Sequence, residues 1–280
     1  MRFCAAALSG EEYNARLIFE GGKTIQFYEV RGTGPAVVLL HPYPSDHTFW
    51  LPIVPMLEAR FQLVMPDLRG LGRSSVGDGP TTMQQIAGDV LGLCDALGIG
   101  RAAFVGCSVG GYAIFELWRQ ARERMNSLAL LDTRAGQDNE EARVARLKNA
   151  GEILERGTEW AVEQMLPRLL SPVTIQSRSD VVDQVLATTR LATAPGMAAL
   201  QRGMAQRPDS LATLASITVP TLVLGGEDDE PTPVSELEIL ARGITGADLK
   251  IIPRAGHLAA MEQPEEVGRL LRDFLERNAR

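Results

Sequence analysis

The sequence predicts a doubly wound α/β protein, in which a mostly parallel sheet is covered by helices on both faces. Short apolar runs alternate with helical patterns along most of the chain, and they lack the polar alternation of half-exposed strands. The length of 280 residues and an apolar share of 45% are enough for one large domain with a full core. The strand-like runs are residues 36–40, 61–65, 102–105, 128–131, 221–224 and 249–252.

Two earlier runs, residues 16–20 and 24–30, flank Gly21 and Gly22 and predict an antiparallel hairpin at the edge of the sheet. The apolar run at residues 3–8 is shorter than the hydrophobic region of a signal peptide. No other apolar stretch approaches the length of a membrane span. We therefore expect a protein that is not exported and that has no membrane partner.

Two helices have clear start signals. Thr81 or Thr82 can cap a helix, with Gln84 or Gln85 completing a capping box. The last helix opens at Pro264, because proline suits the first turn of a helix, where its missing N–H is not needed.

The alternation of strands and helices stops at residue 134, and no strand pattern occurs before residue 217. This stretch holds ten basic and ten acidic residues, so the net charge of −7 belongs to the flanking parts. Pro167, Pro172, Pro195 and Pro208 divide it into about four helices. We interpret it as a helical cap, or lid, inserted in one loop. The predicted boundaries are residues 1–133 and 217–280 for the α/β core and 134–216 for the cap.

Charge and cysteine content exclude several kinds of partner. Lys and Arg number 28 against 35 Asp and Glu, and this mild acidity argues against nucleic acid as a partner. Cys4, Cys94 and Cys107 are odd in number, far apart and without metal-ligand spacing. We therefore expect reduced thiols, a cytoplasmic location and no metal or cofactor.

The first catalytic candidate is Ser108, in the sequence Gly106-Cys107-Ser108-Val109-Gly110. This G-x-S-x-G pattern follows the run at 102–105 directly and precedes a helical run. That context matters more than the pattern, because the serine has to occupy a strained turn between a strand and a helix. We predict that Ser108 is a nucleophile.

A serine hydroxyl needs an imidazole to take its proton. The chain has His41, His47 and His257, and in a fold of this kind the order is serine, acid, histidine. The first two precede Ser108, so His257, which follows the last strand-like run, is predicted to be the base.

The acid is predicted in the loop after residues 221–224, and Asp229 is the preferred candidate. Asp132 competes with it, because it ends another strand-like run and some enzymes of this fold take their acid from there. Otherwise, Asp132 is a hydrogen-bond acceptor that stabilises its loop.

An oxyanion hole needs two backbone donors aimed at one point. The N–H of Val109, next to the nucleophile, is one candidate. The other lies in His41-Pro42-Tyr43-Pro44, where the prolines cannot donate and Tyr43 has the N–H. The Tyr43 ring either lines the acyl pocket or is a packing aromatic.

Together these residues resemble the α/β-hydrolase superfamily. The His-x-x-Pro loop, the segment 67–74, the serine turn and the loops 226–233 and 256–257 occur in the order of that family. The chain is similar to small capped serine esterases, enol-lactonases and cofactor-free haloperoxidases or perhydrolases. The resemblance implies a structural turn at 67–74 and a cis peptide before Pro44, whereas Pro42 stands where the family usually has glycine.

The predicted function is serine-dependent hydrolysis of a small carboxylic ester or lactone through an acyl-enzyme intermediate. Two alternatives stay open: hydrolysis of a carbon–carbon bond in a ring-cleavage product, and a small-molecule receptor that keeps the triad but turns over slowly. The sequence does not indicate an oligomeric state. Four apolar residues of the cap either line a pocket or pack in the core, namely Trp160, Leu166, Met197 and Met204.

Overall fold

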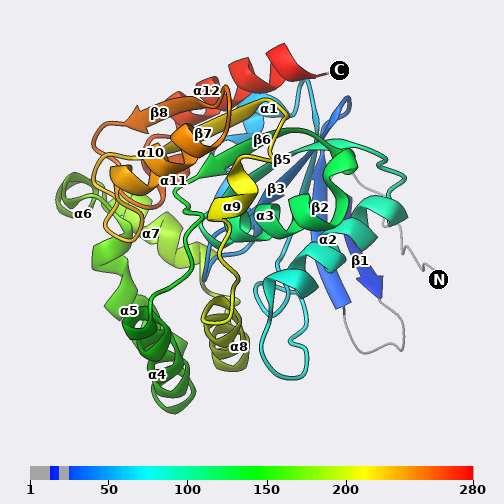
Figure 1. Cartoon of the computed structure of the whole chain (residues 1–280). Helices are drawn as coiled ribbons and strands as arrows, with labels where there is room; N and C mark the ends of the chain where they lie inside the picture. Colours follow the sequence, from blue (N-terminus) through cyan, green and yellow to red (C-terminus); the bar gives the residue numbers. More distant parts are fainter. Residues whose placement is uncertain (1–12, 19–24, 280) are drawn as a thin grey trace.

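The computed structural model describes residues 13–18 and 25–279, and these residues build a sheet of eight strands (Figure 1). Both pairings made by β2 are antiparallel, and every other pair of neighbours is parallel. The predicted doubly wound, mostly parallel sheet is confirmed. Across the sheet the strands are β1 (Tyr13–Ile18), β2 (Ile25–Arg31), β4 (Gln62–Pro66), β3 (Ala36–Leu40), β5 (Ala102–Cys107), β6 (Met125–Leu131), β7 (Thr221–Gly226) and β8 (Asp248–Ile252).

The predicted hairpin is present as the antiparallel pair β1 and β2, with Ile18 opposite Ile25. Its connecting residues, Gly21 and Gly22, lie outside the described residues, and so do Cys4 and the run at 3–8.

Helices cover both faces of the sheet. Val38 and Leu40 of β3 pack into one hydrophobic cluster, whereas Val37 and Leu39 pack into another on the opposite face. Both faces exclude water, which explains why the strands read as unbroken apolar runs. The first face is covered by α2 (Met83–Ala96), α3 (Val109–Ala121) and α10 (Val234–Gly243), and the second by α1 (Val54–Leu57), α11 (Ala259–Glu262) and α12 (Pro264–Asn278).

Local signals fix the start of α2. The Thr82 side chain accepts a hydrogen bond from the Gln85 N–H, and the Thr82 N–H donates to Gln85 Oε1 at 2.9 Å. This is the predicted capping box, and the structure selects Thr82 and Gln85 from the alternatives. Helix α12 begins at Pro264 as predicted.

The stretch from 134 to 216 is helical but is divided differently from the prediction. It contains six helices where the prolines predicted about four, because two boundaries have no proline: Gly157, with φ 90°, separates the first two helices, and Arg178 separates the third from the fourth. Pro167 lies inside the helix that follows, two residues before its end. The helices are α4 (Glu140–Arg156), α5 (Thr158–Leu169), α6 (Pro172–Ser177), α7 (Ser179–Thr188), α8 (Ala194–Met204) and α9 (Leu211–Leu214).

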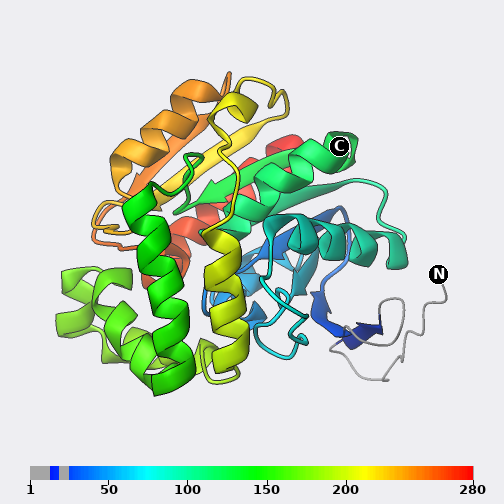
Figure 2. The same cartoon turned by 60° about the horizontal axis from the view of Figure 1, so that its bottom comes forward.

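Helix α8 touches the α/β part of the chain backbone to backbone. A Cβ on Gly196 would lie 1.8 Å from the carbonyl oxygen of Gly70, and one on Gly203 would lie 1.6 Å from that of Thr81. The Thr81 N–H also donates to the Ala199 carbonyl at 3.0 Å. Helix α4 lies alongside α8, and both views show this pair (Figures 1 and 2). Two glycines one heptad apart therefore let α8 approach the core closely.

The segment 67–74 forms a tight turn around Asp67. The Asp67 carboxylate accepts from the backbone N–H groups of His47 and Arg73, at 2.8 and 2.7 Å, and pairs with the His47 ring at 2.6 Å. Burial by itself would lower the pKa of His47, but hydrogen bonds to Asp67 and Glu29 outweigh it and raise the pKa to about 9. The turn is thus held by a buried ion pair.

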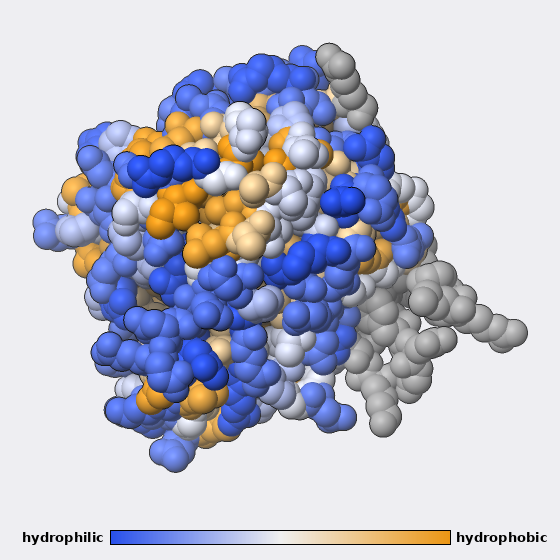
Figure 3. Space-filling model, viewed as in Figure 1, coloured by the Kyte–Doolittle hydropathy of each residue, from blue (hydrophilic) through white to orange (hydrophobic). Residues whose placement is uncertain are grey.

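The visible face of the molecule is mostly hydrophilic, with apolar side chains gathered over α9 and α10 and, lower down, over α4 (Figure 3). Around α4, Val144, Leu147 and Leu154 are exposed. No described helix is both long and apolar enough to cross a membrane. Cys94 and Cys107 are free and buried.

The contact between α8 and the core can be tested with one methyl group. We expect Gly203→Ala to lower the free energy of unfolding by about 1–3 kcal/mol, because the methyl group has no room beside the Thr81 carbonyl. Gly88→Ala is the matched control: Gly88 is exposed in α2 with open space around it, so alanine is expected to raise stability by up to about 1 kcal/mol. Urea unfolding measures both, and equal stability of the two variants would contradict the contact.

Candidate active site

Ser108 occupies a strained turn between β5 and α3. Its backbone has φ 52° and ψ −112°, a conformation that residues other than glycine rarely adopt. Both glycines of the pattern are required by space. A Cβ on Gly106 would lie 2.5 Å from the Gly110 carbonyl carbon, and one on Gly110 would lie 2.2 Å from the Leu40 carbonyl oxygen. The close packing of β3, β5 and α3 therefore holds Ser108 at the carboxyl edge of the sheet.

Three of the predicted residues meet at this turn. His257 Nε2 lies 2.8 Å from Ser108 Oγ, and His257 Nδ1 lies 2.9 and 3.0 Å from the two carboxylate oxygens of Asp229. Asp229 Oδ1 also accepts from the Thr232 N–H at 2.7 Å, which fixes its carboxylate. Because this carboxylate accepts the Nδ1 proton, Nε2 is left to accept the Ser108 hydroxyl proton.

The competing acid, Asp132, is close to the site, but its side chain is bonded to groups other than the imidazole. Its Oδ1 accepts from the Gly226 N–H at 2.9 Å, and its Oδ2 lies 4.0 Å from Cys107 Sγ. Burial, and then the neighbouring Asp229 carboxylate, raise the pKa of Asp132 well above its usual value. These effects favour a neutral Asp132 that stabilises the loop between β7 and α10.

The two predicted oxyanion donors are buried amides beside the turn. Among the described residues, neither the Tyr43 N–H nor the Val109 N–H has a hydrogen-bond acceptor. The cis peptide expected between Tyr43 and Pro44 is present. His41 donates through Nδ1 to the Pro42 carbonyl at 2.9 Å, and its Nε2 accepts from the Leu68 N–H. Since the Pro42 carbonyl and the Tyr43 N–H belong to one planar peptide, His41 also fixes the direction of that N–H.

Glu262 is a site residue that the sequence analysis missed. Its buried carboxylate accepts from the Gly256 N–H at 2.7 Å, next to His257, and from the Ser171 N–H at 2.8 Å. One side chain therefore ties the histidine loop to the residue that precedes α6. The sequence did offer one signal for Glu262: an acidic residue five positions after the histidine, in an otherwise apolar stretch. Its partners are backbone N–H groups, however, and a sequence pattern does not reveal such partners.

The four apolar residues proposed from the sequence have different surroundings. Met197 and Met204 on α8 are buried in the same hydrophobic cluster as Tyr43 and Val109. Trp160 is half-buried and Leu166 packs partly against the opposite cluster. Both methionines thus belong to the core next to the site.

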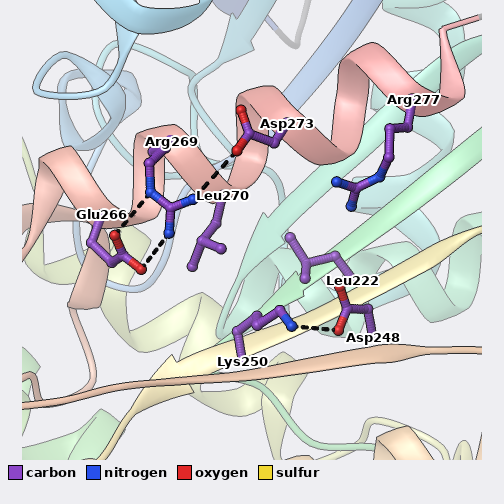
Figure 4. Close-up of a pocket in the computed structure, with 8 residues that line it drawn as sticks. All are labelled: Leu222, Asp248, Lys250, Glu266, Arg269, Leu270, Asp273 and Arg277. Atoms are coloured by element: carbon purple, nitrogen blue, oxygen red, sulfur yellow. Dashed lines mark hydrogen bonds and ion pairs between the residues drawn. The ribbon is translucent and has the colours of Figure 1, made fainter.

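The described residues offer further places where a ligand could bind. Asp46, His47 and Asp67 could group around a metal ion, but His47 is already paired with Asp67 and Glu29, and protonation removes its lone pairs. A cavity of about 380 Å³ lies between β8 and α12, where acidic and basic side chains pair with each other (Figure 4). Its walls include Leu222 and Asp248, near the amino ends of β7 and β8. The cavity is therefore at the opposite edge of the sheet from Ser108.

An eight-stranded α/β sheet with a serine on a tight turn at its carboxyl edge is the architecture of an α/β hydrolase. A model of the alpha/beta hydrolase fold family matches residues 35–264, so the chain belongs to this family. The sequence is 30% identical over 264 residues to 3-oxoadipate enol-lactonase 1 of Acinetobacter baylyi. The matched region covers 91% of this chain and 94% of the relative.

Solved structures show the same architecture. A thermophilic esterase from Thermogutta terrifontis, with malate bound, is 37% identical and superposes with a TM-score of 0.91, covering 95% of this chain and 99% of that one. An enol-lactonase from Burkholderia xenovorans LB400 is 28% identical, with a TM-score of 0.86 and coverage of 93% and 99%.

The bridge made by Glu262 can be separated from simple stabilisation. We expect Glu262→Ala to lower kcat by about 10- to 100-fold at a temperature where the variant is fully folded, because the His257 loop loses its anchor. Glu262→Gln keeps one acceptor oxygen and is expected to recover part of the loss. The control is Glu265→Ala, which removes an exposed carboxylate nearby. A lower Tm with unchanged kcat would show that Glu262 only stabilises the fold.

Proposed function

We propose that this α/β hydrolase cleaves a small carboxylic ester or lactone through an acyl-enzyme intermediate. The observation that carries the proposal is the continuous hydrogen-bonded line from Ser108 through His257 to Asp229, with both ring nitrogens engaged. This arrangement supports nucleophilic catalysis, since a serine hydroxyl reacts near neutral pH when an oriented imidazole takes its proton.

Each group has one role in the proposed mechanism. Ser108 Oγ attacks the carbonyl carbon while His257 Nε2 takes the hydroxyl proton, and Asp229 stabilises the imidazolium that forms. The amides of Tyr43 and Val109 donate to the oxyanion. His257 then protonates the leaving alkoxide, and water releases the acyl group by the same steps in reverse.

The relatives support this class of substrate. The similar proteins include enol-lactonases, which open a cyclic ester, and an esterase. One attacking serine serves both, because a lactone differs from an open ester only in keeping its leaving group tethered. We further propose that residues 134–216 are a cap, with the buried face of α8 beside the acyl pocket.

Ser108→Ala tests the proposed nucleophile. We expect hydrolysis of a short acyl ester to fall by several powers of ten while the Tm changes little, because the hydroxyl contributes chemistry and little packing. A fluorophosphonate probe is expected to label the unchanged protein at Ser108. The control is Ser235→Ala, which removes an exposed hydroxyl from α10. Ordinary turnover by Ser108→Ala would refute the assignment, and a single turnover by the unchanged protein would favour a receptor.

The two candidate acids can be separated by paired amide substitutions. We expect Asp229→Asn to lower kcat by about 10⁴-fold, because the amide cannot stabilise the imidazolium and favours the wrong tautomer. Asp132→Asn keeps an acceptor for the Gly226 N–H and is expected to cause a far smaller loss. Steady-state kinetics on one ester measures both, and the reverse order of the two losses would assign the acid to Asp132.

A further inference from the structure

A buried carboxylate at the base of the cap is surrounded by three arginines. Asp138 Oδ1 lies 2.7 Å from Arg134 Nη2 and 2.9 Å from Arg207 Nη2, and Asp138 Oδ2 pairs with Arg146 Nε. The Asp138 side chain is fully buried. The negative charge of Asp138 therefore faces three positive ones, and Glu236 also acts on Arg134. This leaves excess positive charge in a largely buried place, which is a costly arrangement without an anion.

The cluster lies beside the proposed oxyanion loop. Arg146 Nη1 donates to Gln201 Oε1 at 3.3 Å, and Gln201 lies next to the Tyr43 hydroxyl. Tyr43 is 5% exposed, and its hydroxyl oxygen has no hydrogen-bond partner among the described residues. The same residue, Tyr43, thus carries this hydroxyl at the end of its side chain and, on its backbone, the N–H that we assign to the oxyanion hole. A buried hydroxyl without a partner indicates a group that is completed by a ligand.

The three arginines divide into two kinds. Arg207 donates to the Gly136 carbonyl and stacks on the Tyr112 ring at 4.1 Å, and its side chain is 3% exposed. Arg134 lies where the chain leaves the α/β core, and Arg207 lies near the point where the chain returns to it. Because both pair with Asp138, they connect these two segments. Arg146 differs, because it comes from α4, it donates to Gln201, which lies beside Tyr43, and its side chain is 22% exposed. Its Nη2 group makes no hydrogen bond within the described residues.

We propose that the Tyr43 hydroxyl and the Arg146 guanidinium form a subsite for a carboxylate carried by the substrate. Both groups are donors, and hydrogen bonds from them to a carboxylate are the strong, charge-assisted kind. The substrate class is therefore a small ester or lactone with a second, ionised carboxyl group. This proposal rests on the proposed function, since it orients the substrate with respect to Ser108.

The test compares two esters with acyl chains of the same length, monomethyl glutarate and methyl valerate, which end in a carboxylate and a methyl group. The unchanged protein is expected to have the higher kcat/KM for monomethyl glutarate. In Arg146→Met, the ratio of the two kcat/KM values is expected to fall about 10- to 100-fold, mainly through KM, and in Tyr43→Phe by a smaller factor. Lys148→Met removes a charge from an exposed position of α4 and is expected to leave the ratio unchanged.

Binding of glutarate separates the subsite from the chemistry. Glutarate is expected to raise the Tm of the unchanged protein and of Ser108→Ala, but not that of Arg146→Met. If neither ester is hydrolysed while glutarate still stabilises in this pattern, the proposed function fails and the subsite stands. An equal loss on both esters in Arg146→Met, no preference for monomethyl glutarate in the unchanged protein, or no thermal shift would overturn the subsite.

Discussion

The structure depends on the close contact between the serine turn and strand β3. The Leu40 carbonyl leaves no room for a side chain at position 110, and the carbonyl of Gly110 leaves none at position 106. This contact holds Ser108 in a conformation that an isolated peptide would avoid. It also brings the loop after β3, which carries the Tyr43 amide, beside the serine. A single packing constraint thus positions the hydroxyl and the expected oxyanion donors together.

Electrostatic surroundings give similar residues different properties. Asp132 and Asp229 follow neighbouring strands, yet Asp229 contacts an imidazole and a backbone N–H, whereas Asp132 is fully buried beside another carboxylate. The histidines differ in the same way. Burial lowers the pKa of His41, while two carboxylates raise that of His47. Residue type sets what a side chain can do, and its neighbours decide which of these properties is used.

Much of this arrangement follows from the sequence, because its causes are local. Strands buried on both faces produce unbroken apolar runs, and the serine turn needs glycines at fixed positions, so the sheet and the contact of Ser108 with His257 could be predicted. Gly157 was not recognised as a helix boundary, because the prolines gave a stronger signal. Glu262 and Arg146 could not be found this way either, because Ser171 and Gln201, which they contact, lie far away in the sequence.

Helix α8 meets the core through Gly196 and Gly203, at distances that admit no side chain. Helix α4, which carries Arg146, packs on α8 and α5 and leaves one face exposed. Over evolutionary time this difference separates the maintenance of the fold, which depends on α8, from changes in specificity, which α4 allows. Mutations in α8 disturb its contact with the core, whereas the exposed face of α4 can exchange side chains with little cost to folding. New specificities are therefore expected to arise first on α4, in a lineage that leaves the serine turn unchanged.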